Sequence, residues 1–112
     1  MIEKIAYDQD GFQVLKEFEG WKLGFLRYCE RFSSCREMEQ HLETDEVFVL
    51  LEGNATLYTE TEVCSMCKSV LYNIPKGVWH HITVSEDATV LVIENSNTSR
   101  ANTKKKGVSS PC

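Results

Sequence analysis

Short apolar runs separated by turn-forming residues dominate this chain, and they limit its fold more than any other feature. Trp21, Leu23 and Phe25 recur at every second position, and Val, Phe and Leu fill the run from 47 to 51. Both patterns predict β-strands, because an amphipathic helix requires an apolar period of 3.6. Further strands are predicted at 70–74, 82–84 and 88–94, while 7–18 has room for one helical turn at most. The spacing predicts an all-β sandwich or barrel.

Length and composition indicate a single folded domain. The 112 residues are 42% hydrophobic and 26% charged, as expected for one globular domain. The net charge of −5 argues against nucleic acid or an anionic membrane as partner, because both require a basic face. No apolar run approaches the ~20 residues that span a bilayer, and residues 1–8 do not resemble a secretory signal. With an odd number of cysteines, the chain is expected to be cytoplasmic.

The segment from 46 to 58 predicts both a hairpin and a subunit contact. A strand at 46–52 is followed by Gly53-Asn54 and a second strand at 55–58, which is the pattern of a tight hairpin. The run 47–51 is apolar at every position, so this strand is expected to be covered on both faces. In so short a chain, the second cover is expected to come from another subunit, and we predict a homodimer.

Residues 96–112 are polar and are predicted to lie outside the barrel domain, which is assigned to 1–95. This C-terminal stretch is expected to be a mobile tail or an arm that docks late. It contains Lys104-Lys105-Lys106, and three lysines in an acidic chain predict a solvated segment rather than a nucleic-acid site.

Histidines and glutamates stand at the ends of predicted strands. Glu39 and His41 share a strand face, and Glu46 opens an apolar strand, where a carboxylate is costly unless it is paired or binds a cation. His80 follows a turn, and His81 is expected to point to the opposite face. Imidazoles with carboxylates are ligands of divalent transition metals such as Zn, Fe, Mn or Ni. The alternative is a set of polar residues that hydrogen-bond to one another.

Two segments resemble the motifs of the cupin family. Glu39-Gln40-His41, four residues, Glu46, six residues and Gly53 resemble H-x-H-x(3,4)-E-x(6)-G, and Pro75-x-Gly77-x-x-His80 resembles P-x-G-x-x-H. The sequence departs from the pattern at Glu39, where the family has its first histidine, and at Ser33, Ser69 and Val84. The resemblance covers about residues 20–95 and implies a double-stranded β-helix, or jelly-roll barrel. It implies that His41, Glu46 and His80 bind the metal ion, with Glu39 either as a further ligand or turned away, which would leave three ligands and water.

The resemblance leaves the reaction open. Relatives in the family include dioxygenases, isomerases and epimerases, so it implies a metal-dependent enzyme that acts on a small polar metabolite. The alternatives are a binding module that holds a small molecule or a metal without chemistry, and a barrel with an empty pocket. Cys64 and Cys67 form a C-x-x-C pair, which is expected to be a chance pair in a hairpin loop rather than a redox or zinc site.

Overall fold

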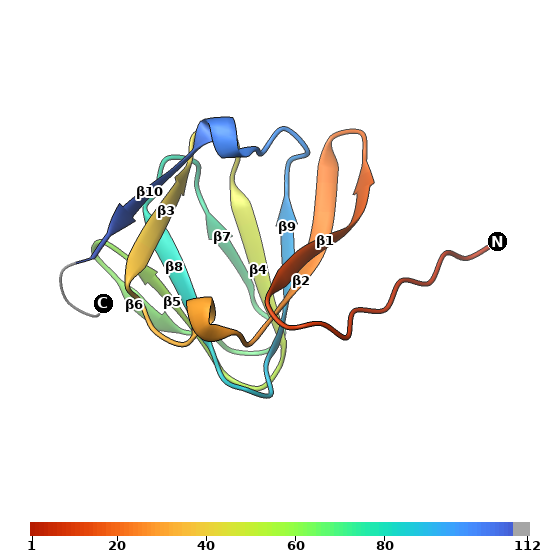
Figure 1. Ribbon diagram of the computed structural model, residues 1–112, viewed down its shortest axis with the longest axis horizontal. Coiled ribbons are helices and arrows are strands. Elements are labelled where there is room, and N and C mark those ends of the chain that lie inside the picture. The colour runs from red at the N-terminus through yellow and green to blue at the C-terminus, as the bar shows by residue number, and fades with distance from the viewer. Residues whose placement is uncertain (109–112) are drawn as a thin grey trace.

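Ten β-strands and two short 3₁₀ helices are formed by residues 1–108, the residues that the computed structural model describes (Figure 1). No α-helix occurs among them, which confirms the prediction of an all-β fold. The elements are β1 (Phe12–Phe18), β2 (Trp21–Arg27), η1 (Glu30–Phe32), β3 (Glu37–His41), β4 (Glu46–Glu52), β5 (Ala55–Thr59), β6 (Val63–Ser65), β7 (Leu71–Ile74), β8 (His80–Val84), β9 (Thr89–Glu94), η2 (Arg100–Asn102) and β10 (Thr103–Gly107).

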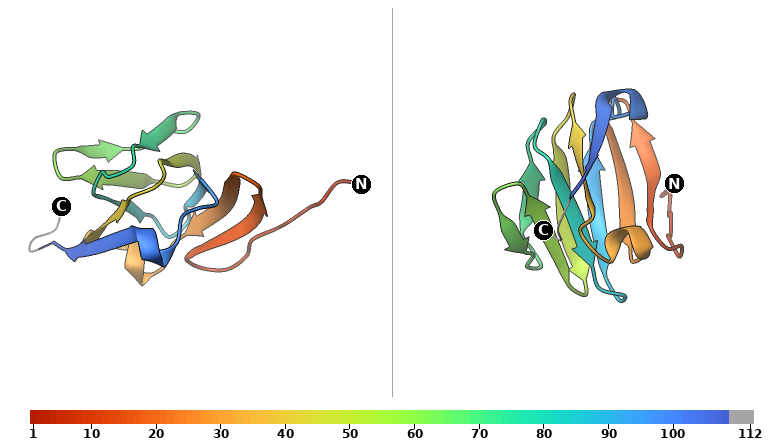
Figure 2. Two further views of the ribbon diagram at one scale, coloured as in Figure 1. Left: turned by 90° about the horizontal axis from the view of Figure 1, so that it is seen from above. Right: turned by 60° about the vertical axis from the view of Figure 1, so that its left-hand side comes forward.

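The strands form two antiparallel sheets that face each other around a common interior (Figures 1 and 2). One sheet has the order β1-β2-β9-β4-β7 and the other has the order β10-β3-β8-β5-β6. Apart from the consecutive pairs β1-β2 and β5-β6, neighbouring strands are not consecutive in the chain, as expected when a jelly roll winds back and forth between its two sheets. The structure therefore confirms the predicted jelly-roll barrel.

The turn at Gly53 joins two strands that belong to different sheets. β4 pairs with β7 and β9, whereas β5 pairs with β6 and β8. The predicted hairpin between these strands is therefore wrong, although both strands and the turn are present. Gly53 has a φ of 74°, and a Cβ atom there would lie 2.6 Å from the Cα atom of Ala88. A glycine lets the chain pass Ala88 closely as it crosses from one sheet to the other.

The core lies between the inward faces of the two sheets. Phe48 and Leu50 of β4 are buried there, and Val90 and Val92 of β9 are the most deeply buried large side chains of the described residues. The outward side chains of β4 are half-buried or exposed, and Leu51 is 42% exposed. This chain therefore covers one face of β4, and the predicted second cover remains a prediction.

Residues 1–10 lead into the barrel without forming a strand and extend away from it (Figure 1). Tyr7 anchors this segment, because its ring is buried and its hydroxyl lies 2.7 Å from the carbonyl oxygen of Asp10 and 3.0 Å from that of Gly11. The region predicted to hold at most a helical turn contains β1, which pairs with β2.

The C-terminal segment is part of the second sheet. β10 pairs with β3 along its whole length, from Thr103 opposite His41 to Gly107 opposite Glu37. Residues 103–107, part of the segment expected to be a mobile tail or a docking arm, form this strand, and residues 109–112 of that segment lie outside the described residues. Within the described part of the chain, no helix has the length and apolarity required to cross a membrane.

Candidate metal centre

Three of the four predicted ligands lie together at one end of the barrel interior. His41 ends β3, Glu46 begins β4 and His80 begins β8, and these residues are only 7%, 8% and 4% exposed. Glu46 Oε1 lies 2.8 Å from His80 Nε2 and 3.2 Å from His41 Nε2. Among residues 1–108 this is the one group of three side chains whose ligand atoms all lie within 4.8 Å of one another. Two imidazoles and a carboxylate therefore converge on one point.

Backbone hydrogen bonds hold the two motif segments against each other. Gly77 donates its backbone N–H to the carbonyl oxygen of His41 at 2.8 Å, and the Gln40 amide donates to the carbonyl oxygen of Gly77 at 2.8 Å. The Asp45 carboxylate accepts a hydrogen bond from a backbone N–H of the same turn, also at 2.8 Å. Because the turn before β8 is tied to the end of β3 and the start of β4, it brings His80 to the other two ligands.

The second ring nitrogen of each histidine also has a partner. His80 Nδ1 lies 2.9 Å from the carbonyl oxygen of Val78, which can only accept, so Nδ1 carries a proton and donates it. His41 Nδ1 lies 3.0 Å from the hydroxyl of Thr103. Histidines that bind metal ions commonly donate their other ring N–H to a backbone carbonyl in this way. The Nε2 atoms of both rings are therefore the atoms left to face Glu46.

The carboxylate at the centre of the group is ionised at neutral pH. Burial by itself would raise the pKa of Glu46, but hydrogen bonds from His41 and His80 and the charges of the two rings lower it to about 2. Burial likewise works to lower the pKa of His41, but the hydrogen bond and the charge of Glu46 raise it above its ordinary value. The group thus carries a buried negative charge that favours a cation beside it, whether a proton or a metal ion.

Glu39, the fourth predicted ligand, lies at the edge of this group. Its Oε2 is 3.9 Å from His41 Nε2, and it does not belong to the group of three. Its Oε1 accepts a hydrogen bond from the Arg31 guanidinium and lies 3.7 Å from Lys105 Nζ. Two cations therefore compete with a metal ion for this carboxylate.

Glu94 is a site residue that the sequence reasoning missed. It ends β9 directly opposite Glu46 and is 8% exposed, and within residues 1–108 its Oε2 atom is buried without a hydrogen bond of normal geometry. Burial raises the pKa of Glu94 to about 7, and the charge of Glu46 adds to the increase. The sequence contained a signal for Glu94, because this residue ends the apolar run 88–94 just as Glu46 begins another apolar run. A carboxylate in an otherwise apolar strand is as costly at either position.

A cavity of about 280 Å³ lies beside the group. Its apolar walls come from both sheets and from η1. Its charged lining consists of Lys22, Arg31, Glu39, Glu46, Glu94, Arg100 and Lys105. An apolar hollow with a few convergent polar groups is the usual form of a small-molecule site.

His81 takes no part in the group of three. It is 4% exposed, and its ring is stacked on that of Phe32 with the centroids 6.2 Å apart. Burial lowers its pKa, and the charge of Arg31 lowers it further, so the ring is neutral at pH 7. The buried ring thus packs beneath η1 and borders both the cavity and a second hollow of about 430 Å³.

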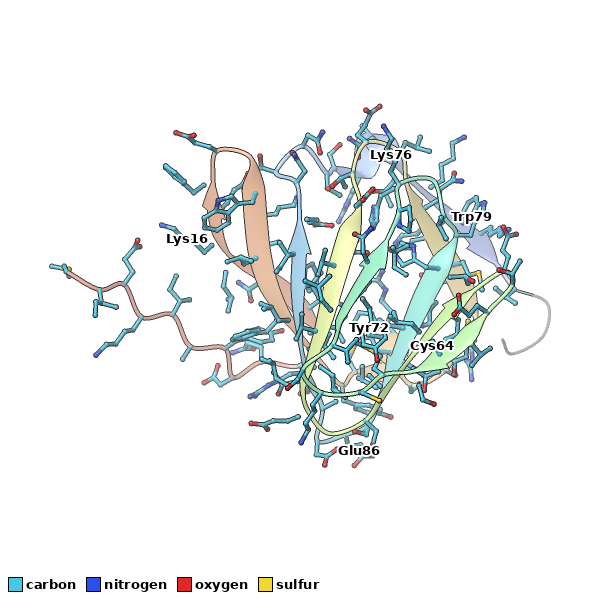
Figure 3. All side chains as sticks on the ribbon, turned by 180° about the vertical axis from the view of Figure 1, so that it is seen from behind. Lys16, Cys64, Tyr72, Lys76, Trp79 and Glu86 are labelled. Atoms are coloured by element: carbon cyan, nitrogen blue, oxygen red, sulfur yellow. The ribbon has the colours of Figure 1, made fainter. Side chains whose placement is uncertain are left out.

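The C-x-x-C pair is not part of the candidate centre. Cys64 lies on β6 and Cys67 in the loop after it, and both are free thiols. Figure 3 shows Cys64 far from Lys76, which lies in the turn of the second motif. Neither cysteine joins two other ligand side chains among the described residues.

Solved structures with the same architecture identify the fold. No protein-family model and no curated protein matches the chain. A cupin-2 domain containing protein from Shewanella frigidimarina is 24% identical, with a TM-score of 0.64 over 80% of this chain and 84% of that chain. Pac13 from Streptomyces, described as a nucleoside dehydratase, is 8% identical, with a TM-score of 0.74 over 98% and 95% of the two chains. KdgF from Halomonas is 12% identical, with a TM-score of 0.62 over 83% and 87%.

At these identities the likeness establishes architecture rather than activity. It agrees with the jelly-roll arrangement of the two sheets. This chain has the cupin fold.

Proposed function

We propose that His41, Glu46 and His80 bind one divalent transition metal ion, which acts on a small polar ligand in the cavity. The contact of 2.8 Å between Glu46 Oε1 and His80 Nε2 carries this proposal. His80 Nδ1 carries a proton and donates it to the carbonyl oxygen of Val78. In a neutral His80, the Nε2 atom would therefore direct its lone pair at a charged carboxylate oxygen. A cation bound by both atoms removes that repulsion.

The donor set and its spacing fit such an ion. Two ligand atoms at right angles around one ion, each about 2.1 Å from it, lie about 3 Å apart. The separations from Glu46 Oε1 to the two imidazole nitrogens are 2.8 Å and 3.2 Å. His41 Nε2 is buried and faces the same carboxylate oxygen as His80 Nε2, so one ion could be bound by all three atoms. Two imidazoles and one carboxylate suit zinc, iron, manganese or nickel and leave coordination positions open for a ligand.

A bound ion would supply Lewis-acid or redox chemistry at this end of the barrel. The protein would supply proton transfer and orientation. Glu94 has a buried Oε2 and a pKa raised to about 7, so it can accept or donate a proton near neutral pH. The apolar wall excludes water from the ligand. We therefore propose an enzyme of the dioxygenase, isomerase or epimerase type, and the alternative is a module that binds without turnover.

Elemental analysis of untagged protein, purified without chelator, tests the site directly. Wild type is expected to hold close to one metal ion per chain. His41→Ala, Glu46→Gln and His80→Ala are expected to lose it, because each removes one ligand atom. Cys64→Ser/Cys67→Ser serves as the matched control and should retain the metal. Metal that persists in all three ligand variants but leaves the cysteine variant would overturn the assignment.

A metal-free acid–base site is the second candidate, and the same contact favours it. A proton on His80 Nε2 also satisfies the distance of 2.8 Å to Glu46 Oε1. Nitrogen-15 NMR separates the two cases. This candidate would be supported if both ring nitrogens of His80 carry a proton at neutral pH in protein that takes up no added metal. The metal site would be supported if one ring nitrogen carries no proton and its resonance shifts when metal is added.

We further propose that the protein acts in the cytoplasm. We also propose that two copies associate through the outward face of the β1-β2-β9-β4-β7 sheet. Large apolar patches on a protein surface usually mark interfaces, and a sheet face can pair with a second copy of itself. Leu51→Glu with Leu71→Glu should convert a dimer to a monomer in sedimentation velocity, whereas Val63→Glu on the other sheet should not. A monomeric wild type would refute the dimer. The apolar residues of this face are Leu23, Phe25, Val47, Val49, Leu51, Leu71, Leu91 and Ile93.

A further inference from the structure

Basic side chains gather around the cavity although the chain as a whole is acidic. The chain has 17 acidic and 12 basic residues, whereas the lining of the cavity has three acidic and four basic residues. A cleft with low-dielectric walls focuses the field of its own charges. The lining of the cavity has an excess of basic residues, whereas the whole chain has an excess of acidic ones. The basic residues come from four separate segments, as Lys22 of β2, Arg31 of η1, Arg100 of η2 and Lys105 of β10.

The ion pairs in the cavity wall do not use all of its basic side chains. Glu39 pairs with both Arg31 and Lys105, so two cations share one carboxylate. Glu94 lies 3.7 Å from the ammonium of the β2 lysine. None of the ion pairs found within residues 1–108 includes Arg100, which is exposed. Arg100 and one of the two partners of Glu39 are thus available to an incoming anion.

The backbone that carries Arg100 is fixed over the cavity. Asn102 accepts a hydrogen bond from the Ser99 backbone N–H at 2.9 Å and donates its side-chain amide to the Asn97 carbonyl oxygen at 2.8 Å. Lys22 Nζ donates to the carbonyl oxygen of Thr98 at 2.8 Å, which ties this loop to β2. A guanidinium on an ordered loop loses less entropy when it binds an anion.

The pairing of β10 assigns one lysine of the Lys104-Lys105-Lys106 run to the cavity. Lys105 lies opposite Glu39 in the β3–β10 register and lines the cavity. Its neighbours point to the other face because side chains alternate along a strand. Lys106 Nζ lies 4.5 Å from the centre of the Trp79 ring, and Figure 3 shows Trp79 beside β10. Lys104 therefore offers a control of the same residue type, one position away and on the opposite face.

We propose that the cavity binds a small anion, a carboxylate or a phosphate, whose charged group is held by Arg100 and Lys105. A guanidinium can bind either group with two parallel hydrogen bonds. A volume of about 280 Å³ is below the common range for drug-sized ligands, so the anion is a small metabolite. The inference rests on the proposed function, because the remainder of the anion is taken to reach the metal centre at His41, Glu46 and His80.

Calorimetric titration of metal-loaded protein with succinate, inorganic phosphate and the neutral succinamide tests this inference. Wild type should bind at least one of the two anions and not succinamide. The affinity for that anion should fall at least tenfold in Arg100→Gln/Lys105→Gln and stay within twofold in Lys104→Gln. Tighter binding of succinate would indicate a carboxylate ligand, and tighter binding of phosphate would indicate a phosphorylated one.

Three outcomes would overturn the inference: no binding of either anion, equal binding of succinamide, or unchanged affinity in the double variant. The metal content of each protein separates this failure from failure of the proposed function. Wild type and double variant that both hold metal but bind anions equally would refute the anion site alone. Wild type that takes up no metal would refute the metal centre, and the same titrations on that protein would still decide the anion site.

Discussion

The two ends of the barrel interior are built from the same strands but have opposite contents. At one end the inward side chains are imidazoles and carboxylates, and at the other end they are apolar. Each of three strands makes the change within four residues, from Glu46 to Leu50 on β4, from His80 to Val84 on β8 and from Glu94 to Val90 on β9.

Because of this difference, the side chains that stabilise the fold and those of the candidate site lie at opposite ends of one small core. Buried apolar side chains contribute favourable free energy to folding, whereas buried carboxylates cost free energy unless they are paired. The favourable free energy of the apolar end can therefore offset the free-energy cost of burying a charge at the polar end. That buried charge favours a cation beside it. If this division is correct, substitutions at the two ends should produce different kinds of defect.

A cavity at the apolar end should produce the largest loss of stability. Leu50 is 3% exposed, so Leu50→Ala is expected to lower the free energy of unfolding by about 2–5 kcal/mol. Val63 on β6 is 63% exposed, and Val63→Ala should change it by less than about 0.5 kcal/mol. Urea unfolding measures both variants. A loss below about 1 kcal/mol in Leu50→Ala would show that this end is not the stabilising one.

Metal binding should give the polar end its own contribution to stability. Zinc at 100 times its dissociation constant would raise the free energy of unfolding of wild type by about 2.7 kcal/mol. Glu46→Gln removes the charged ligand, so unfolding of this variant should be insensitive to zinc. Glu52→Gln, an exposed glutamate at the far end of the same strand, should respond like wild type. An equal response of Glu46→Gln to zinc would place the ion elsewhere.

The crossing between sheets at the apolar end should tolerate a methyl group poorly. Gly53 and Gly77 both have positive φ values, of 74° and 83°, and an alanine is strained at either position by about 1–2 kcal/mol. A Cβ atom at Gly53 would also collide with Ala88 at 2.6 Å, whereas one at Gly77 would meet open space. Gly53→Ala should therefore lower the thermal unfolding midpoint more than Gly77→Ala does. Equal decreases would show that the crossing adjusts freely.

Three side chains of the polar end were predicted from the sequence to lie together. The two motifs carry His41, Glu46 and His80, and the structure brings these three together as the resemblance implied. Such a motif works because it records residue types at fixed distances from turns, and here Gly77 ties its turn to His41 directly. The apolar patterns also predicted β2, β4, β5, β7, β8 and β9, whereas β1, β6 and β10 were not predicted.

What the sequence did not predict depends on pairing between distant segments. The residues around Gly53 determine a local bend, but the partners of β4 and β5 are chosen by packing across the whole barrel. Glu94 belongs to neither motif and reaches the site only because β9 pairs with β4. The lysines of 104–106 have low strand propensity, and β10 is an edge strand whose pairing with β3 places Lys105 at the cavity.

A titratable group at the apolar end should have the smallest effect of those considered. The Tyr7 hydroxyl lies within hydrogen-bond distance of two backbone carbonyl oxygens, so Tyr7→Phe is expected to cost about 1 kcal/mol near pH 8. Burial raises the pKa of Tyr7, and the charge of Asp10 raises it further.

The sign of the pH dependence follows from that increase. A folded-state pKa above the unfolded value gives a stabilisation that is complete below about pH 10 and is lost as the pH rises through the folded pKa. The advantage of wild type over Tyr7→Phe should therefore shrink between pH 9 and pH 11 in paired urea titrations, because the unfolded wild type releases its phenolic proton first. An advantage that grows over this range would mean that the folded protein stabilises the phenolate. The apolar end would then favour a buried charge, as the polar end does, and the contrast between the two ends would fail.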